Sequence, residues 1–421
     1  MAGISLSVRS PLAVLSLLCA GYAVSFFHRV CPAVLSVDLM RDFSLDAASF
    51  SLISSSTMLG YALTQIPSGM LADVIGGRKT LALYQVLAGL LCMAFTFCDG
   101  LASAVSCRFL LGLTLAANIP AYKILALRVP SRDYARYSAV LTCSGAVGTL
   151  MAASPLVALT GLAGWRGALF MAGAFTVLLG FALLILLRRP SVGEAVRIPS
   201  IRENVRSLKE GAGVVLRMKQ FWLIFLWFMF VIGNMFALVT MWWGGYLMQA
   251  NGLSREAAGL SISIMSLGPL PLVLVVPWLS DNVFRSRRVF LLAAALLESA
   301  AFGFIWLNGD SPLPFAALTA LGLMVTVSTN ALGTLCFTMV KECVPVSALA
   351  SACGLLNASG PVMAAVVQSV FGAVVAWRTA EGCSNAAAYG DAFAFLFAGS
   401  LVAVGAALFM KDTLDRGRDR D

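Results

Sequence analysis

Few side chains in this sequence could do chemistry, and those that could lie in stretches that are otherwise apolar. His28, the only histidine, is followed at once by Arg29. A guanidinium group binds a carboxylate or phosphate through two parallel hydrogen bonds, and an imidazole can take up a proton near neutral pH. The pair therefore suggests anion binding at Arg29 and, at His28, a group that could carry a proton.

The composition places this pair inside a membrane. Of the 421 residues, 60% are hydrophobic and only 12% are charged, and the mean hydropathy is +0.89. Soluble domains carry about 25% charged residues, so we expect a chain that crosses a bilayer many times. A cation in hydrocarbon costs about 3 kcal/mol or more, so a buried arginine faces a protein interior or a water-filled cavity. We therefore expect the chain to surround a cavity into which Arg29 points.

The same composition argues against several classes of function. Nearly all of the ten cysteines fall within apolar runs and none form a C-x-x-C pair, so they are interpreted as small buried hydrophobic residues. No nucleotide-binding G-x-x-x-x-G-K-[ST] sequence occurs, and no nucleophile is paired with a base. The net charge of +9 follows membrane topology rather than nucleic acid. We expect neither an enzyme nor a metal ion, cofactor or nucleic acid as a partner.

Twelve stretches are long enough to cross the hydrocarbon core, which takes about 20 apolar residues as a helix. A polar, basic segment at 189–219 divides them six and six. We predict an all-α polytopic membrane protein with a six-helix bundle at 1–188, a cytoplasmic central loop at 189–219, and a second six-helix bundle with a short cytoplasmic tail at 220–421. The approximate spans are 11–36, 50–72, 80–98, 101–127, 137–160, 167–188, 220–247, 257–280, 289–308, 313–340, 348–375 and 391–410.

The basic residues predict the orientation of these spans. With the N-terminus in the cytoplasm, 22 of the 29 Lys and Arg fall on the cytoplasmic side, and four fall on the other side, at Arg41, Arg166, Arg255 and Arg378. Lys and Arg are enriched in cytoplasmic loops. Both termini are therefore expected in the cytoplasm.

The two halves of the chain also contain similar short sequences at equivalent positions. The tripeptide Gly-Trp-Arg at 164–166 recurs as Ala-Trp-Arg at 376–378, and Asp73 and Asp281 each follow the second expected helix of their half. Matches at nearly equal separations argue for duplication, which is common among membrane transporters. We therefore expect two pseudo-symmetric bundles.

The loop after the second expected helix carries the most specific pattern. Residues 69–79 read GMLADVIGGRK, which fits G-x-L-A-D-x-x-G-x-R-[KR]. This loop resembles the signature loop of the major facilitator superfamily, and residues 277–288 repeat its acid and its basic run with Pro277 in place of the first glycine. The resemblance implies that the loop latches the two halves in one state of the cycle. Its expected residues are Gly69, Asp73, Gly76, Arg78, Asp281 and Arg285.

Further stretches resemble the anion:cation symporter family within that superfamily, which carries sugar acids, other organic anions and phosphate. They include Tyr22, His28-Arg29 and Pro32 in the first expected helix, and residues 108–121 in the fourth. Two departures concern proton coupling in that family. His28 stands where the family usually has an acid, and Leu115 stands where sugar-acid members often have a glutamate.

The resemblance and the residues together give the expected site. Arg29 is expected to bind the anion, or else to pair with Glu298. His28 is expected to take up a proton when an anion arrives, or else to form a neutral hydrogen bond between helices. Arg108 is expected to join substrate or proton handling, or else to pack against backbone carbonyls. Lys123 is a second anion contact or a side chain that reaches the membrane interface, and Glu298 is a second proton-coupling candidate.

Weaker candidates lie on helices that face the cavity in this fold. Tyr61 and Gln65 are four residues apart and share one helix face. Each member of this group could equally form ordinary bonds between helices. The expected additional substrate ligands are Tyr61, Gln65, Asn234, Trp242 and Asn357.

Taken together, the sequence predicts a secondary active transporter that moves a small organic anion by alternating access. The anion would be a carboxylate, sugar acid, sulfonate or phosphate-like compound, and import by proton symport is favoured over sodium coupling. The alternatives are a proton-coupled exporter of a drug-like or siderophore-like compound and a membrane sensor on the same scaffold that does not transport. We expect a monomer in the bacterial inner membrane.

Overall fold

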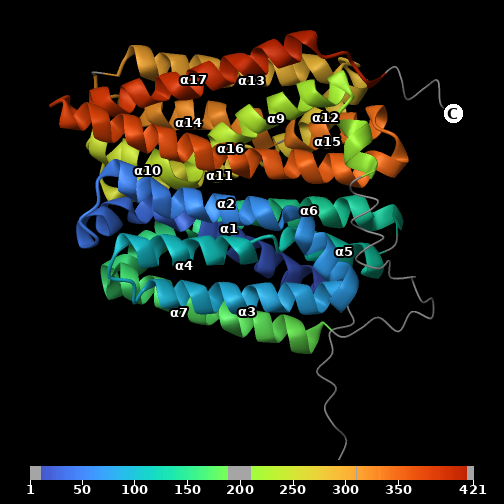
Figure 1. Ribbon diagram of the computed structural model, residues 1–421, viewed down its shortest axis with the longest axis horizontal. Coiled ribbons are helices and arrows are strands. Elements are labelled where there is room, and N and C mark those ends of the chain that lie inside the picture. Colours follow the sequence, from blue (N-terminus) through green and yellow to red (C-terminus); the bar gives the residue numbers. More distant parts are fainter. Residues whose placement is uncertain (1–10, 130, 188–209, 310, 331, 415–421) are drawn as a thin grey trace, which may run out of the picture.

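The computed structural model describes residues 11–129, 131–187, 210–309, 311–330 and 332–414, and its regular structure over these residues is helical throughout (Figure 1). The all-α architecture expected from the sequence is therefore confirmed. The elements are α1 (Pro11–Asp42), α2 (Ala47–Leu71), η1 (Ala72–Gly76), α3 (Gly77–Phe95), α4 (Leu101–Thr114), α5 (Asn118–Arg128), α6 (Ser131–Met151), α7 (Ser154–Leu186), α9 (Lys219–Ala237), η2 (Leu238–Trp242), α10 (Trp243–Gly245), η3 (Tyr246–Ala250), α11 (Arg255–Leu267), α12 (Leu272–Asn282), α13 (Arg287–Leu307), α14 (Phe315–Asn330), α15 (Leu332–Cys343), α16 (Val346–Ala380) and α17 (Asn385–Phe409).

Eight helical stretches within the described residues are long and apolar enough to cross a membrane. One of them, Arg136–Leu186, has 51 residues and contains a non-helical position at Gly164, where φ is 67°. Because one crossing takes about 20 residues, this stretch is long enough for two. The number of twelve crossings stays a prediction.

Three expected continuous helices are interrupted, each beside a proline. The expected helix at 137–160 ends at Met151 and resumes at Ser154, directly before Pro155. The expected helix at 101–127 ends at Thr114 and resumes at Asn118, two residues before Pro120. The expected helix at 257–280 ends at Leu267 and resumes at Leu272, after two prolines. Proline lacks the N–H of the helical ladder and its ring crowds the preceding turn, so expecting unbroken helices there was wrong.

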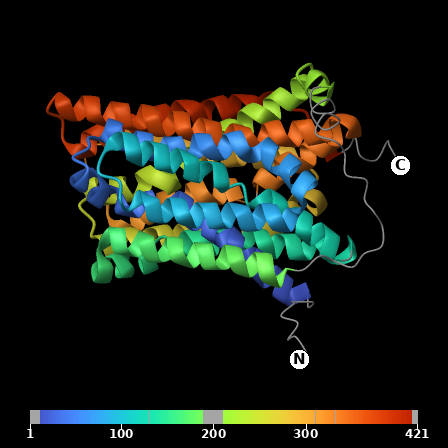
Figure 2. The same cartoon turned by 60° about the horizontal axis from the view of Figure 1, so that its bottom comes forward.

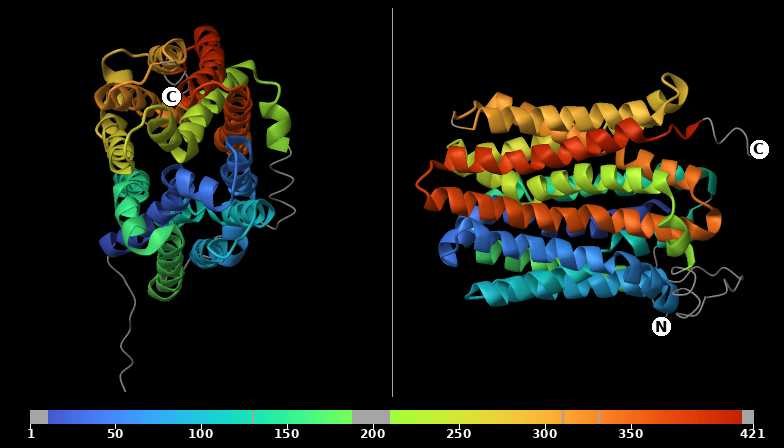
Figure 3. Two further views of the ribbon diagram at one scale, coloured as in Figure 1. Left: turned by 90° about the vertical axis from the view of Figure 1, so that its left-hand side faces the viewer. Right: turned by 45° about the horizontal axis from the view of Figure 1, so that its top comes forward.

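The helices up to α7 lie together on one side of the molecule, and those from α9 to α17 lie together on the other (Figures 1 and 2). Within the first set, α3 packs on α7, α2 on α4 and α1 on α6; within the second, α13 packs on α17 and α9 on α16. The sets meet where α2 packs on α16, α1 on η2 and α6 on α11. The view along the helices shows the two sets facing each other across the middle of the molecule (Figure 3). Most of segment 189–219 lies outside the described residues.

The two ends of the molecule differ in charge and in packing. One end, called the basic end below, carries Arg78, Arg128 and Arg288; the opposite end carries Asp38 and Arg255. At the opposite end, the two sets are joined by an ion pair of 2.7 Å between Asp38 on α1 and Arg255 on α11.

A hydrophobic cluster toward the opposite end also includes side chains from both sets. Phe50 of α2 lies edge-on to Trp242 of η2, with the ring centroids 6.2 Å apart, and Trp242 stacks on Phe371 of α16 at 4.9 Å. All three rings are almost fully buried. Buried aromatic surface excludes water, so this cluster closes the gap between the two sets at that level.

Candidate functional site

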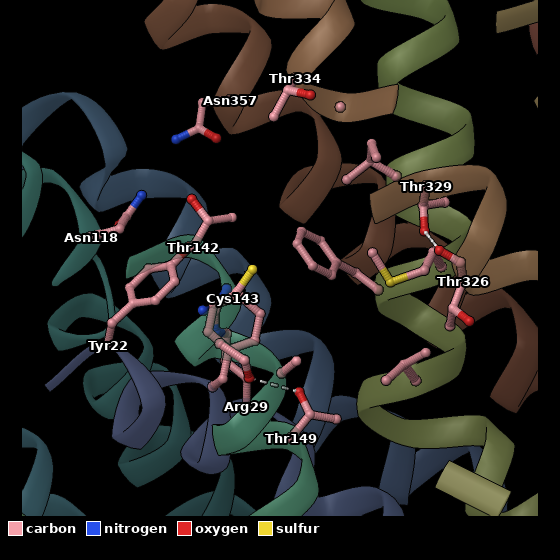
Figure 4. A pocket seen from close by; sticks show the side chains of 18 of the residues that line it. Tyr22, Arg29, Asn118, Thr142, Cys143, Thr149, Thr326, Thr329, Thr334 and Asn357 are labelled. Atoms are coloured by element: carbon pink, nitrogen blue, oxygen red, sulfur yellow. Dashed lines mark hydrogen bonds between the residues drawn. The ribbon is translucent and has the colours of Figure 1, made fainter. Parts of the chain in front are cut away.

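A cavity of about 610 Å³ lies between the two sets of helices. Figure 4 shows Tyr22, Arg29, Thr142 and Thr149 on one side of it, facing Thr326 and Thr329 on the other. Its lining combines aromatic rings with polar side chains, which are uncharged except for that of Arg29. The polar lining consists of Arg29, Gln65, Asn118, Thr142, Thr149, Thr240, Ser266, Thr326, Thr329, Thr334 and Asn357, and the rings are Tyr22, Phe26, Tyr122, Phe228, Phe236 and Phe337.

Arg29 is the only charged residue in this lining, counted over the described residues. Its Cζ atom lies 3.8 Å from the centroid of the Phe26 ring and 4.6 Å from that of Tyr61, so the guanidinium is held between two aromatic faces. Nε donates a hydrogen bond of 3.2 Å to the Ser25 carbonyl. Within the described part of the chain the two Nη groups have no such partner, which leaves the fork of donors free for a ligand.

The ring that supports Arg29 is positioned by close contact between α1 and α6. A Cβ atom at Gly148 would lie 1.9 Å from the Ala23 carbonyl oxygen, so only glycine lets the two backbones approach this far. One turn earlier, Gly145 lies under the Phe26 ring. The small residues of α6 thus determine how Phe26 and Arg29 face the cavity.

Two of the weaker candidates meet across the interface between the two sets. The Asn357 amide on α16 donates to the Gln65 side-chain oxygen on α2, and both residues line the cavity. Tyr61 lies one turn before Gln65 and contacts Arg29 through its ring. The structure therefore places Arg29, Gln65 and Asn357 in the cavity lining, with Tyr61 behind Arg29 and outside the lining.

Four other candidates lie away from the cavity lining. Arg108 is 2% exposed and donates to the His28 carbonyl at 3.0 Å and toward the Cys31 sulfur at 4.0 Å. Lys123 pairs with Asp73 and donates to the Ala72 carbonyl. The Asn234 amide donates to the Leu396 carbonyl, and the Trp242 indole to the Gln368 carbonyl. The donors in these contacts are taken by the protein in this conformation, whereas Arg108 Nε has no partner among the described residues.

The two proton-coupling candidates are also buried outside the lining. His28 Nε2 lies 3.0 Å from the Thr176 hydroxyl of α7, and its Nδ1 has no partner among the described residues. Glu298 of α13 is fully buried beside Asn234, with neither carboxyl oxygen at hydrogen-bond distance from a described donor. An ion pair between Arg29 and Glu298, the expected alternative, is therefore not present.

The signature loop lies at the basic end and is tied to neighbouring helices. Asp73 pairs with Lys123 of α5, and Arg78 donates to the Leu187 carbonyl at 3.1 Å. In the second half, Asp281 lies 3.5 Å from Arg287, which pairs with Glu342 at 2.8 Å. Gly69 faces Ile119, and Gly76 and Arg285 both adopt positive φ, 88° and 48°. The two halves thus use an equivalent acid in similar ion pairs.

Several lining residues were not among the expected ligands. Tyr22 and Phe26 lie two turns and one turn before Arg29 on α1, and helical spacing places them on the same side. Asn118 and Tyr122 come from α5, which the break after α4 re-aims. The hydroxyl groups of Thr326 and the neighbouring threonines carry no sequence signal beyond their spacing on α14.

The sequence model described as Major Facilitator Superfamily matches residues 15–245 of this chain, which is more than half of it. The chain belongs to the Major Facilitator Superfamily. Its relatives and structural neighbours are named as transporters, or in one case as a membrane sensor protein, rather than as enzymes, as the sequence predicted. The match covers all the elements that hold Arg29 in the first set of helices.

Curated relatives of this superfamily member include proteins named for different anions. A probable hexose phosphate transport protein of Chlamydia muridarum is 25% identical over 301 residues, which are 64% of this chain and 64% of that protein. The 4-hydroxybenzoate transporter PcaK of Pseudomonas aeruginosa is 24% identical over 323 residues, 69% of this chain and 70% of that protein. The chain thus spans somewhat less than two thirds of the Chlamydia relative.

Solved structures show the same fold. A bacterial homologue of the human lysosomal transporter Spinster, in an inward-facing and unoccupied conformation, aligns over 97% of both chains with a TM-score of 0.73 and 18% identity. At this identity the likeness concerns architecture alone.

Proposed function

We propose that this protein is a secondary active transporter of a small organic anion, and that Arg29 binds the anionic group. The observation that carries the proposal is the free guanidinium fork of Arg29 in the cavity between the two sets of helices. A site at this interface is reached from either side when one bundle rocks against the other. A fork of parallel donors suits a carboxylate, which accepts two hydrogen bonds from it.

The lining favours an anion with one negative charge and a flat apolar body. In the described residues the lining has a single cation and no carboxylate, so a dianion such as a sugar phosphate would keep one charge without a partner. Six aromatic rings line the cavity, including Phe26 and Phe236, whose ring centroids lie 3.8 Å and 6.0 Å from the Arg29 Cζ atom. Rings pack well against rings. An aromatic monocarboxylate therefore fits this cavity better than a polyhydroxylated phosphate ester does.

The side that the cavity faces follows from which end is closed. The ion pair between Asp38 and Arg255 and the cluster around Trp242 join the two sets at the opposite end, which supports a cavity that faces the basic end. Basic loops lie in the cytoplasm, so this conformation would face the cytoplasm. Both termini would then lie on the cytoplasmic side of a bacterial inner membrane. We propose uptake as a monomer, driven by proton symport rather than sodium, with the buried Glu298 rather than His28 as the group that holds the proton.

Uptake into proteoliposomes tests the function and the substrate class together. We expect labelled 4-hydroxybenzoate to accumulate when the outside is acidic, and to equilibrate only when the pH gradient is collapsed. Glucose 6-phosphate, supplied in parallel, should be taken up at least about tenfold more slowly because its second charge has no partner in the cavity. Preference for the sugar phosphate would overturn the monoanion argument and leave organic-anion transport standing.

The alternatives give different results in the same experiment. Efflux of the anion against its gradient when protons flow inward indicates an exporter. Saturable binding of the anion to purified protein, with no flux in either direction, indicates a sensor. Absence of both binding and flux for any small carboxylate or phosphate contradicts the proposal as a whole.

A further inference from the structure

We propose that Arg108 is a positioning residue, which supplies the hydrogen bond that Pro32 cannot make and so holds the segment of α1 that presents Arg29 to the cavity. The inference rests on the proposed role of Arg29 as the anion ligand. Its experiment includes a readout that needs no ligand, so the two proposals can fail separately.

The reason lies in the backbone of α1. Pro32 stands inside this helix, which runs unbroken from Pro11 to Asp42. In a helix the N–H of residue 32 would donate to the carbonyl of residue 28, and proline has no N–H. The His28 carbonyl is therefore left without its helical partner. His28 is fully buried, and among the described residues the Cys31 thiol, a weak donor, reaches this oxygen at 3.6 Å. A buried carbonyl without a strong donor destabilises the fold.

Arg108 meets this need from the neighbouring helix α4. Its Nη2 donates to the His28 carbonyl oxygen at 3.0 Å, and its Nη1 lies 4.0 Å from the Cys31 sulfur. The guanidinium is almost fully buried, lies outside the cavity lining, and pairs with no carboxylate in the described ranges. A side chain placed to bind substrate would aim its donors at the cavity, whereas these donors contact a single turn of α1.

A second backbone carbonyl near a proline of the same bundle is bound by a neutral side chain. Ala116 lies in the break between α4 and α5, four residues before Pro120, and the Ser68 hydroxyl of α2 donates to its carbonyl at 3.0 Å. Side chains of neighbouring helices commonly satisfy backbone groups that proline frees inside membranes. Arg108 makes the corresponding contact inside a helix that is not broken, α1.

The position of this contact links it to the anion site. Arg29 follows His28 directly, and its own Nε donates to the Ser25 carbonyl one turn earlier. The two helical turns from Ser25 to Pro32 are therefore held by Arg29 on the cavity side and by Arg108 on the core side. Loss of the core contact would let this turn shift, and with it the guanidinium held between Phe26 and Tyr61.

Restoring the missing N–H tests the inference. Arg108→Met should weaken 4-hydroxybenzoate binding by about tenfold and lower the thermal midpoint of the ligand-free protein by about 3 °C. Adding Pro32→Ala gives the His28 carbonyl a helical donor, so the double variant should return to within about threefold of the original affinity and regain most of the lost midpoint. Pro67→Ala, in the interior of α2, is the matched control and should rescue neither.

Each outcome decides the matter. Rescue by Pro32→Ala and not by Pro67→Ala supports the inference, and rescue of the midpoint alone supports it even if this probe does not bind. Failure of Pro32→Ala to rescue, when Pro32→Ala alone folds normally, overturns it. If Arg108→Met does not fold, recovery of a folded protein in the double variant is the supporting result, and its absence is the contrary one.

Discussion

Two buried arginines of the first set of helices, Arg29 and Arg108, are used in opposite ways. Both are at most 3% exposed, and neither pairs with a carboxylate in the described part of the chain. Arg29 keeps its Nη groups toward the cavity and rests between the rings of Phe26 and Tyr61. Arg108 directs Nη2 to the His28 carbonyl and Nη1 toward the Cys31 sulfur, both on the helix that carries Arg29.

The difference shows that burial and charge do not by themselves identify a ligand-binding arginine. The two residues differ in what the N–H groups of their guanidinium contact. A guanidinium has five N–H groups, and those already bonded to carbonyls cannot bind substrate. This difference supports the proposals that Arg29 binds the anion and that Arg108 holds the helix that presents Arg29.

The largest expected effect is at Arg29. Arg29→Met should weaken anion binding by at least about 100-fold, because truncating a desolvated charge that pairs with a ligand typically costs about 3 kcal/mol or more. The thermal midpoint of the ligand-free protein should stay within about 2 °C, since the main lost contact is one hydrogen bond to Ser25. Titration calorimetry and a thermal unfolding assay measure both quantities.

Arg29→Lys provides the matched control for this variant. Lysine keeps the charge and loses the fork, so binding should fall by about tenfold, between the original protein and Arg29→Met. Unchanged binding in Arg29→Lys would remove the argument from paired donors. A midpoint that falls further in Arg29→Met than in Arg108→Met would reverse the comparison between the two arginines.

The sequence was sufficient to predict the all-helical architecture and to single out Arg29 as a candidate anion ligand. A cation in an apolar run is conspicuous, so Arg29 could be found from composition and helical spacing. The signature loop likewise stands out, because its glycines and charges have fixed spacing. Gln65 and Asn357 were expected on cavity-facing helices, and the structure joins them to each other across the interface.

The role of Arg108 depends on which face of a helix meets which neighbour, and a single sequence does not contain that information. Arg108 was left open between substrate handling and backbone packing, and only the position of α4 against His28 separates these roles. Lys123 faces Asp73 because α5 begins anew at Asn118. Pro32 does carry a signal in the sequence, because a proline inside a membrane helix predicts a free carbonyl four residues before it, here that of His28.

A smaller effect is expected at Tyr61, whose ring covers one face of the Arg29 guanidinium. Tyr61→Leu removes a cation–π contact worth about 1 kcal/mol, so anion affinity should fall by about fivefold. Tyr61→Phe keeps the ring and should bind within about twofold of the original protein. Equilibrium binding to purified protein distinguishes the two. Equal losses in both variants would indicate that the hydroxyl, rather than the ring, contacts the anion.

The smallest effect is expected at His28, although this residue lies next to Arg29 in the sequence. Its ring is turned toward Thr176 of α7, and its side chain is absent from the cavity lining described by the structure. His28→Gln can keep a hydrogen bond to the Thr176 hydroxyl, so affinity should change by less than about twofold. Accumulation against a gradient under an imposed pH difference should also persist, and Thr176→Val serves as the control for the lost contact. Retained binding with loss of uphill accumulation in His28→Gln, but not in Thr176→Val, would instead assign the coupling proton to His28 and give both neighbours in this pair a direct part in transport.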